Sequence, residues 1–242
     1  MATSRHVPQL PLALRSPPDQ RLETFVAAPD GAIALLTACA SGASNDWIFV
    51  SGPAGCGKTH LLLGTCAQAL ADAQRPAYLS LATAAGRLSD ALQAFEGMDL
   101  VALDDLDAIA GDRDDEVALF DFHNRARGNG ARVVYAATAR PDALALVLPD
   151  LRSRLGQCIG IALTLLDDEA RREVLRQRAQ RRGLVVDEAA LDWLMRRVGR
   201  DLGSLTQLFD RLDRAALAAQ RRLTVPFLRE ILGRESDVRS GD

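Results

Sequence analysis

The residues best placed to do chemistry lie in a glycine-rich loop, G-P-A-G-C-G-K-T, at residues 52–59. The loop fits the P-loop pattern G-x-x-x-x-G-K-[ST] at every fixed position. Its glycines permit a tight turn that aims backbone N–H groups at phosphate oxygens, and the start of a following helix adds positive partial charge. Lys58 would reach the β- and γ-phosphates, and the Thr59 hydroxyl would bind Mg²⁺. The predicted nucleotide contacts are Gly52, Pro53, Ala54, Gly55, Cys56, Gly57, Lys58, Thr59 and His60.

A pair of carboxylates, Asp104 and Asp105, follows an apolar run that begins at residue 98. A buried parallel strand that ends in an acid delivers it to the crevice where phosphates bind. We expect Asp104 to hold Mg²⁺, directly or through water, and Asp105 to orient or deprotonate the attacking water. The alternative is a strand followed by a helix cap, since acids are common in this stretch.

A polar residue, Thr138, follows another apolar run at residues 132–137. From that position it could contact the γ-phosphate or the attacking water. A threonine that merely closes a strand in a turn is the alternative, and the residues alone do not decide between them.

The elements that must position these groups alternate between short apolar runs and helical patterns. Strand-like runs occupy residues 47–50, 76–81, 98–103, 132–137 and 159–163, and helices are expected near 83–95 and 114–127. This alternation predicts an α/β fold with a parallel sheet. From residue 167 the strands stop and four helical patterns follow, which predicts a small all-helical domain. Its arginines, between 171 and 182, are interspersed with acids and predict a solvated helix face.

The composition is that of an ordinary soluble protein. The 242 residues are 48% apolar and carry a net charge of −3, so no global charge attracts nucleic acid. No apolar run is long enough to cross a membrane, and no signal peptide is visible. The cysteines lack metal-ligand or redox spacing, which predicts reduced thiols in a cytoplasmic protein. They are Cys39, Cys56, Cys66 and Cys158.

The first 20 residues are rich in proline and contain the stretch Q-L-P-L-A-L at 9–14. A glutamine followed by alternating leucines could lay an extended peptide into an apolar pocket on another protein. The alternative is an apolar segment that packs on its own domain.

Together these features resemble an AAA+ module: a P-loop, an acid pair, Thr138, an arginine-bearing segment and a helical lid occur in that order. The stretches L-P-D-L-R-S-R-L at 148–155 and R-R-L-T-V-P-F-L-R-E-I-L at 221–232 resemble the Hda family, small homologues of the replication initiator DnaA. The resemblance covers nearly the whole chain and implies a P-loop AAA+ parallel sheet flanked by helices, followed by a small all-helical lid. The expected domains are a tail at 1–20, an AAA+ domain at 21–165, a lid at 166–233 and a tail at 234–242.

The resemblance also implies a function. Members of this family bind the DNA polymerase III sliding clamp (its beta subunit), engage ATP-bound DnaA and promote hydrolysis to inactive DnaA-ADP. Replication initiation is thereby negatively regulated. The resemblance implies a cytoplasmic adaptor that binds ADP or ATP and Mg²⁺. It would be nucleoid-associated, reach DNA only through the clamp and have no membrane partner. Self-association is a possibility. The implied clamp contacts are Gln9, Leu10, Leu12 and Leu14.

Two arginines acquire roles through the resemblance. Arg154 matches the arginine finger that enters a neighbouring subunit's site, with a surface ion pair as the alternative. Arg152 stands where the family more often has a small residue, so the assignment has a rival. Arg200 matches the lid's sensor arginine that reaches the nucleotide, with a loop arginine as the alternative.

The chain departs from the family in one respect. Members of the family often carry a degraded P-loop or acid pair, whereas both are intact in this sequence. Asp105 stands where many AAA+ ATPases use glutamate, so we expect hydrolysis by the isolated protein below about 1 s⁻¹. Two other functions compete with the adaptor. One is a DnaA-like or helicase-loader-like ATPase that acts directly on DNA or another protein, although no DNA-binding domain is expected in the residues after Leu232. The other is a small-molecule kinase that uses the P-loop.

Overall fold

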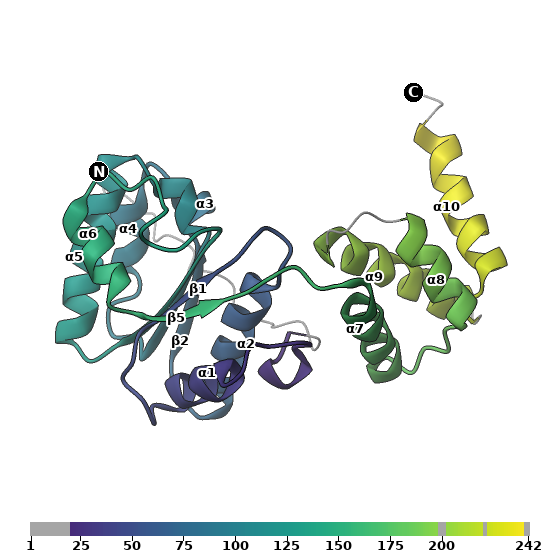
Figure 1. The fold of residues 1–242 in the computed structure, drawn as a ribbon, viewed down its shortest axis with the longest axis horizontal. Coiled ribbons are helices and arrows are strands. Elements are labelled where there is room, and N and C mark those ends of the chain that lie inside the picture. The colour runs from purple at the N-terminus through teal and green to yellow at the C-terminus, as the bar shows by residue number, and fades with distance from the viewer. Residues whose placement is uncertain (1–19, 198–201, 220–221, 240–242) are drawn as a thin grey trace, which may run out of the picture. The chain divides into compact units, whose positions relative to one another are not determined.

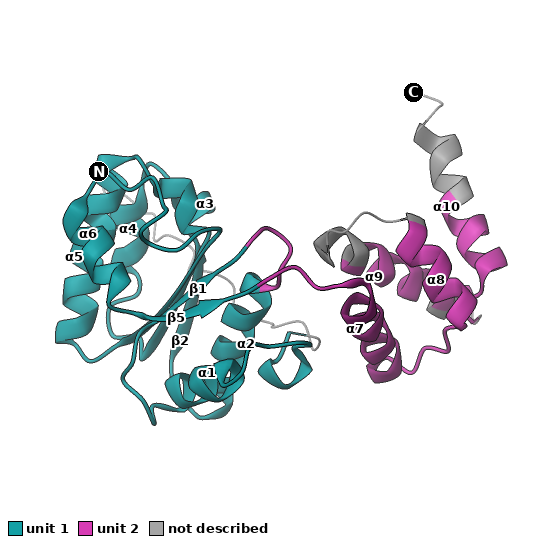
Figure 2. Cartoon of the chain, in the orientation of Figure 1, with its two compact units in different colours: residues 1–52, 58–163 teal, residues 53–57, 164–242 magenta. Residues whose placement is uncertain are grey.

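The computed structural model describes residues 20–197, 202–219 and 222–239. The described residues form two compact units (Figure 2). One contains the residues up to 52 together with 58–163, and the other contains 53–57 together with the residues from 164 onward.

The first unit is built on a five-stranded sheet in which every neighbouring pair of strands is parallel (Figure 1). Its strand order is β2-β3-β4-β1-β5. The strands are β1 (Ile48–Ser51), β2 (Pro76–Ser80), β3 (Leu100–Asp104), β4 (Arg132–Ala137) and β5 (Ile159–Ala162). The predicted α/β class and parallel sheet are confirmed.

The register aligns the carboxyl ends of neighbouring strands. Ser51 of β1 pairs with Ala137 of β4, and Ser80 of β2 pairs with Asp104 of β3. Because β4 lies between β1 and β3, Thr138, the residue after β4, lies between Gly52, the residue after β1, and the acids that end β3. All the expected phosphate-site groups of this unit therefore reach one edge of the sheet.

Helices cover both faces of this sheet (Figure 1). Alternate strand residues such as Phe49, Val101 and Tyr135 pack with α3 to α6 in one apolar cluster, as the two-residue period of a strand requires. The α2 helix packs against β2, β3 and β4 and against α1. The helices and turns are η1 (Leu22–Thr24), α1 (Ala32–Ser41), α2 (Lys58–Ala71), α3 (Leu81–Ala84), α4 (Leu88–Gln93), η2 (Leu106–Ile109), α5 (Arg113–Gly128) and α6 (Pro149–Gly156).

The single helix predicted near 83–95 is wrong, since two short helices, α3 and α4, occupy this stretch. Gly86 interrupts them in a left-handed conformation with φ of +80°, which glycine adopts readily. The carboxylate of Asp115 accepts the N–H groups of Gly86 and Leu88. A tertiary contact thus replaces the hydrogen bonds that a continuous helix would supply.

The second unit contains the helices α7 (Asp168–Arg181), α8 (Glu188–Arg197), α9 (Leu202–Ala219) and α10 (Val225–Arg239). They enclose a core that includes Leu175, Leu191, Phe209 and Phe227. Helix α10 runs past residue 233, where the family resemblance placed the end of the lid. Ion pairs with acids are formed by Arg171, Arg172, Arg176 and Arg178 of α7, and the one between Arg176 and Glu188 measures 3.0 Å.

Candidate nucleotide-binding site

The P-loop joins β1 to α2 through a backbone that only glycine accommodates easily. Gly55 and Gly57 have φ values of +78° and +102°, in the region that residues with a Cβ atom rarely adopt. The N–H of Cys56 donates to the carbonyl of Pro53 at 3.3 Å, which closes the turn. Helix α2 begins directly afterwards at Lys58. A glycine turn that leads into a helix N-terminus is a ready-made phosphate site.

Lys58 and Thr59 open α2 and lie at the carboxyl edge of the sheet. The Lys58 side chain is buried, and its ammonium donates to the carbonyl of Gly52 at 2.7 Å. The Thr59 hydroxyl donates to Oδ2 of Asp104 at 2.6 Å. The structure thus brings together the P-loop cation, the P-loop hydroxyl and the first acid of the predicted pair.

Asp104 is fully buried at the end of β3 and accepts several hydrogen bonds. Besides Thr59, the Tyr78 hydroxyl donates to it at 3.1 Å and the Asp105 N–H at 2.9 Å. Burial raises the pKa of Asp104 and the charge of Asp105 adds to this effect, while the hydrogen bonds oppose it. A threonine hydroxyl and a carboxylate close together are the hard oxygen donors that Mg²⁺ prefers beside a bound phosphate, so these residues fit that ion.

Asp105 occupies a strained backbone position, with φ of 56°. Non-glycine residues rarely adopt this conformation, and it is found mostly where the surrounding structure enforces it. The Ser80 hydroxyl, at the end of the neighbouring strand β2, donates to its carboxylate at 2.6 Å. The strained turn and Ser80 together fix the direction of the second acid.

Thr138 is exposed at the end of β4, and Asp107 holds it on two sides. Its backbone N–H donates to one carboxylate oxygen of Asp107 at 2.8 Å, and its hydroxyl donates to the other. Asp107 therefore sets the orientation of the residue that we expect beside the γ-phosphate.

Three residues of this edge were not among the predicted site residues: Tyr78, Ser80 and Asp107. Each orients a predicted group through a direct hydrogen bond. Tyr78 and Ser80 could have been found from sequence, because polar side chains near the carboxyl end of a predicted strand reach the same edge as Asp104. Asp107 gave no such signal, since the 3-10 turn η2 (Leu106–Ile109) that carries it was not predicted.

The side chain of His60 turns to the segment before α1. Its Nε2 lies 2.9 Å from the carbonyl of Arg21 and 3.2 Å from the hydroxyl of Thr24. Its ring meets that of Phe25 edge-on, with centroids 5.3 Å apart. The imidazole thus anchors η1 to α2.

The two arginines of α6 have different surroundings. The guanidinium of Arg152 donates to the carbonyl of Leu146 within its own unit. The half-buried side chain of Arg154 forms no ion pair or hydrogen bond with the described part of the chain. Its charge, with that of Arg127, adds to the effect of burial in lowering the pKa of His123 to about 4. The neutral imidazole offers Arg154 no negative partner. Arg200 and the tail residues Gln9, Leu10, Leu12 and Leu14 lie outside the described residues.

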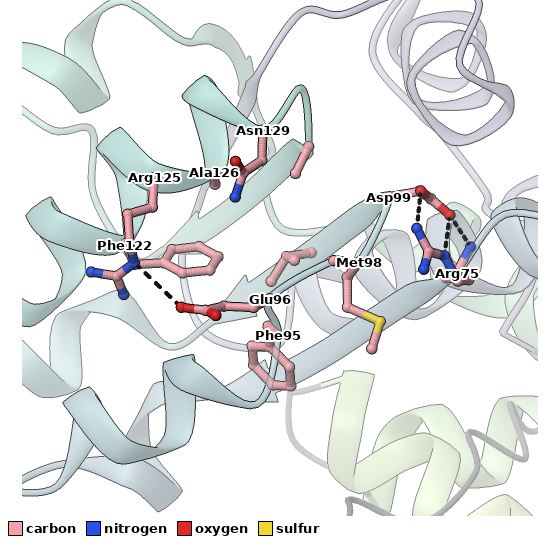
Figure 3. A pocket seen from close by; sticks show the side chains of 12 residues that line it. Arg75, Phe95, Glu96, Met98, Asp99, Phe122, Arg125, Ala126 and Asn129 are labelled. Atoms are coloured by element: carbon pink, nitrogen blue, oxygen red, sulfur yellow. Dashed lines mark hydrogen bonds and ion pairs between the residues drawn. The ribbon is translucent and has the colours of Figure 1, made fainter.

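A hollow of about 90 Å³ lies at the other edge of the sheet, near the amino ends of β3 and β4 (Figure 3). The apolar side chains of Phe95, Met98 and Phe122 line it. Ion pairs between Arg75 and Asp99 and between Glu96 and Arg125 border it. The hollow therefore lies at the opposite ends of the strands from Lys58, Thr59, Asp104, Asp105 and Thr138, which we call the P-loop edge.

No described helix has both the length and the apolar character to span a membrane. Within the same residues, no group of three or more histidine, cysteine or acidic side chains forms a metal cluster. None of the four described cysteines, Cys39, Cys56, Cys66 and Cys158, forms a disulfide.

The parallel sheet with β4 between β1 and β3, the P-loop after β1 and the acid pair after β3 define an AAA+ module. Comparison with known families agrees: residues 18–162 match the bacterial DnaA ATPase domain and residues 168–232 match the lid domain of Hda. The chain belongs to the Hda-type homologues of DnaA.

A protein of Haemophilus influenzae, described as uncharacterized, is 34% identical over 228 residues, which is 93% of this chain and 98% of the relative. Among solved structures, domain III of DnaA from Thermotoga maritima superposes with a TM-score of 0.74 at 20% identity and covers 90% of this chain and 97% of its own. AMPPCP-bound DnaA from Aquifex aeolicus gives a TM-score of 0.65 at 22% identity and covers 81% and 65%. The RuvB branch-migration motor of Thermotoga maritima gives 0.62 at 18%, covering 88% and 72%. These structural likenesses concern the fold.

Proposed function

We propose that the chain binds an adenine nucleotide, ADP or ATP, together with Mg²⁺ at the P-loop edge. The glycine turn and the start of α2 hold the phosphates, and Lys58 leaves the Gly52 carbonyl to pair with them. Thr59 and Asp104 hold the ion, which supplies positive charge against the phosphate oxygens. Asp105, fixed by Ser80, orients water, and Thr138, fixed by Asp107, faces the terminal phosphate. The binding of AMPPCP by a DnaA of the same fold supports the choice of an adenine nucleotide.

The main output of the chain in this proposal is hydrolysis of ATP bound to DnaA. Arg154 enters the nucleotide site of a neighbouring DnaA, where its guanidinium offsets the charge on the phosphoryl group in transfer. Such a finger is worth about 10³–10⁵ in rate in other NTPases. The observation that carries this step is the contrast on α6, where Arg152 is engaged within its own unit and Arg154 has no partner among the described residues.

The tail completes the adaptor. Gln9, Leu10, Leu12 and Leu14 bind the DNA polymerase III sliding clamp and so place Arg154 near DnaA on replicated DNA. The product is inactive DnaA-ADP, and initiation is negatively regulated. Support for this part comes from the Q-L-P-L-A-L sequence and from the family.

The deciding experiment measures hydrolysis of DnaA-bound ATP in the presence of clamp loaded on DNA. We expect hydrolysis to require both this chain and the clamp, and Arg154→Ala to lower the stimulated rate by about 10³-fold or more. The matched control is Arg152→Ala on the same helix, which should cost less because its contact is internal. Absence of stimulation by the wild-type chain contradicts the proposal. Stimulation that survives Arg154→Ala and is lost in Arg152→Ala moves the finger to Arg152.

A separate experiment tests the tail. The double variant Gln9→Ala with Leu12→Ala should lose binding to the isolated clamp, because it removes the polar anchor and one apolar anchor of the peptide. Nucleotide affinity should be unchanged, since neither residue belongs to the P-loop edge. Surface-immobilised clamp and a fluorescent nucleotide measure the two affinities. Retained clamp binding would refute the tail assignment.

A further inference from the structure

Glu116, in the first turn of α5, has a fully buried side chain. Its carboxylate accepts three backbone N–H groups from two other segments. Gly111 donates at 2.8 Å, Val147 at 2.9 Å and Leu148 at 2.6 Å. A buried carboxylate is costly unless its oxygens are hydrogen-bonded, and hydrogen bonds to a charged acceptor are about twice as strong as neutral ones. Glu116 therefore binds the segment at 147–148 firmly to α5.

The segment held in this way is the entry to α6, which has no strong cap of its own. Leu148 is the N-cap residue and supplies no side-chain hydrogen bond, whereas Ser, Thr, Asp or Asn would supply one. Eight residues are also too few for an isolated helix to be stable in water. The geometry of α6 must therefore come from its contacts with the rest of the unit.

Three sets of contacts provide that geometry. Leu151 and Leu155, one turn apart, are fully buried in the apolar cluster and fix which face of α6 packs inward. Arg152 holds the carbonyl of Leu146 from the helix side. Glu116 holds the two following N–H groups from the α5 side. The carboxylate also lies at the positive end of α6, where negative charge is favourable.

We propose that Glu116 is a positioning residue for Arg154: it fixes the N-terminus of α6 and thereby the direction in which the finger is presented. The inference rests on the proposed function of Arg154. Glu116 itself does not touch the nucleotide of DnaA. Its contribution is geometric, and a misplacement of about 1 Å far from the chemistry can cost up to about 10²-fold in rate.

The neighbouring residue supplies a matched control. Asp115 lies in the same turn, is 4% exposed and also accepts two backbone N–H groups, from Gly86 at 2.7 Å and Leu88 at 3.3 Å. Those groups lie at the break before α4 and at its first residue, not in the segment that leads into α6. Asp115→Asn therefore weakens a buried carboxylate of the same kind without releasing the finger.

The experiment compares Glu116→Gln, Asp115→Asn and wild type in hydrolysis of DnaA-bound ATP with clamp loaded on DNA. The rate at saturating chain and the half-saturating concentration are measured separately. We expect Glu116→Gln to lower the saturating rate by about 10- to 100-fold with little change in half-saturation, and Asp115→Asn to preserve the rate. An unchanged rate in Glu116→Gln, or an equal fall in both variants, overturns the inference.

Hydrogen exchange of the isolated chain tests the mechanical step without DnaA. Glu116→Gln should speed exchange at 147–156 and Asp115→Asn at 86–88. Unchanged exchange at 147–156 overturns the inference. All rates are taken below the melting temperature of each variant. If Glu116→Gln does not fold, Glu116→Asp, which keeps the charge but shortens the reach, replaces it. A wild-type chain that fails to stimulate DnaA contradicts the proposed function itself, whereas an active wild type matched by Glu116→Gln contradicts this inference alone.

Discussion

The P-loop edge and helix α6 present charged groups in opposite ways. At the P-loop edge, polar side chains bind one another: Asp104 accepts from Thr59 and Tyr78, and Asp105 accepts from Ser80. Around α6, the backbone is bound by the buried carboxylate of Glu116, and Arg154 is left without an ion pair or hydrogen bond among the described residues.

This difference indicates two kinds of site. In the proposed function, the network of side chains closed within the chain receives a small ligand that takes over some of its hydrogen bonds. In the same proposal, Arg154 on its firmly held helix completes a site on another molecule. The two regions should therefore respond independently to mutation, and the following predictions test that independence.

The largest effects should appear when the two cationic side chains, Lys58 and Arg154, are each replaced by alanine and compared in one experiment. Lys58→Ala should weaken ADP and ATP binding by about 10- to 100-fold, because a hydrogen bond to a charged group is worth about 1.5–3 kcal/mol. Arg154→Ala should leave this affinity unchanged while it abolishes stimulation of DnaA. Titration with a fluorescent nucleotide measures the affinities. A loss of nucleotide affinity in Arg154→Ala would contradict the division into two sites.

A smaller effect is expected for the free energy of unfolding at Asp104. Burial raises its pKa above the ordinary value, so the folded state binds a proton more readily than the unfolded state does. Ionising the buried carboxyl therefore costs folding free energy. This cost is absent below the pKa of the unfolded state, grows as the pH rises to the pKa of the folded state, and then stays constant. Asp104→Asn removes this cost and should raise the melting temperature of the nucleotide-free chain at pH 7 by a few degrees, about 2–4 °C per kcal/mol.

The control for this prediction is a titration of stability. The difference in melting temperature between Asp104→Asn and wild type should disappear as pH falls below about 4, where the wild-type carboxyl is protonated in both states. The same variant should bind Mg²⁺-nucleotide less tightly, because an amide is a poorer ligand for the ion. A destabilised variant at pH 7 would show that the hydrogen bonds to Asp104 outweigh its burial.

The P-loop edge was largely predictable because its residues carry local signals. The pattern at 52–59 and the acids after an apolar run can each be recognised from a few consecutive residues. Parallel strands then bring their carboxyl ends to one edge. Ser80 could have been found as a polar side chain at the end of a predicted strand, but its contact with Asp105 depends on β2 lying next to β3. Asp107 was not predicted, because its position depends on the turn after β3.

The surroundings of α6 were the least predictable part. The sequence offered Arg152 and Arg154 two positions apart, and only the resemblance to Hda favoured the second. Their difference arises because Leu146 presents its carbonyl to Arg152, and because Glu116 reaches across 31 and 32 positions in sequence to hold Val147 and Leu148. No local pattern encodes such contacts.

The sequence by itself determined the α/β class, the glycine-rich P-loop turn and the acid pair at a strand end, because the spacing of residues along a strand or turn dictates local geometry. The tertiary structure alone decided the break at Gly86, the hydrogen-bond partners of Asp104 and Asp105, and the different surroundings of Arg152 and Arg154. Each of these depends on hydrogen bonds between segments far apart in the chain. Such bonds form only once the sheet has fixed the distances between those segments.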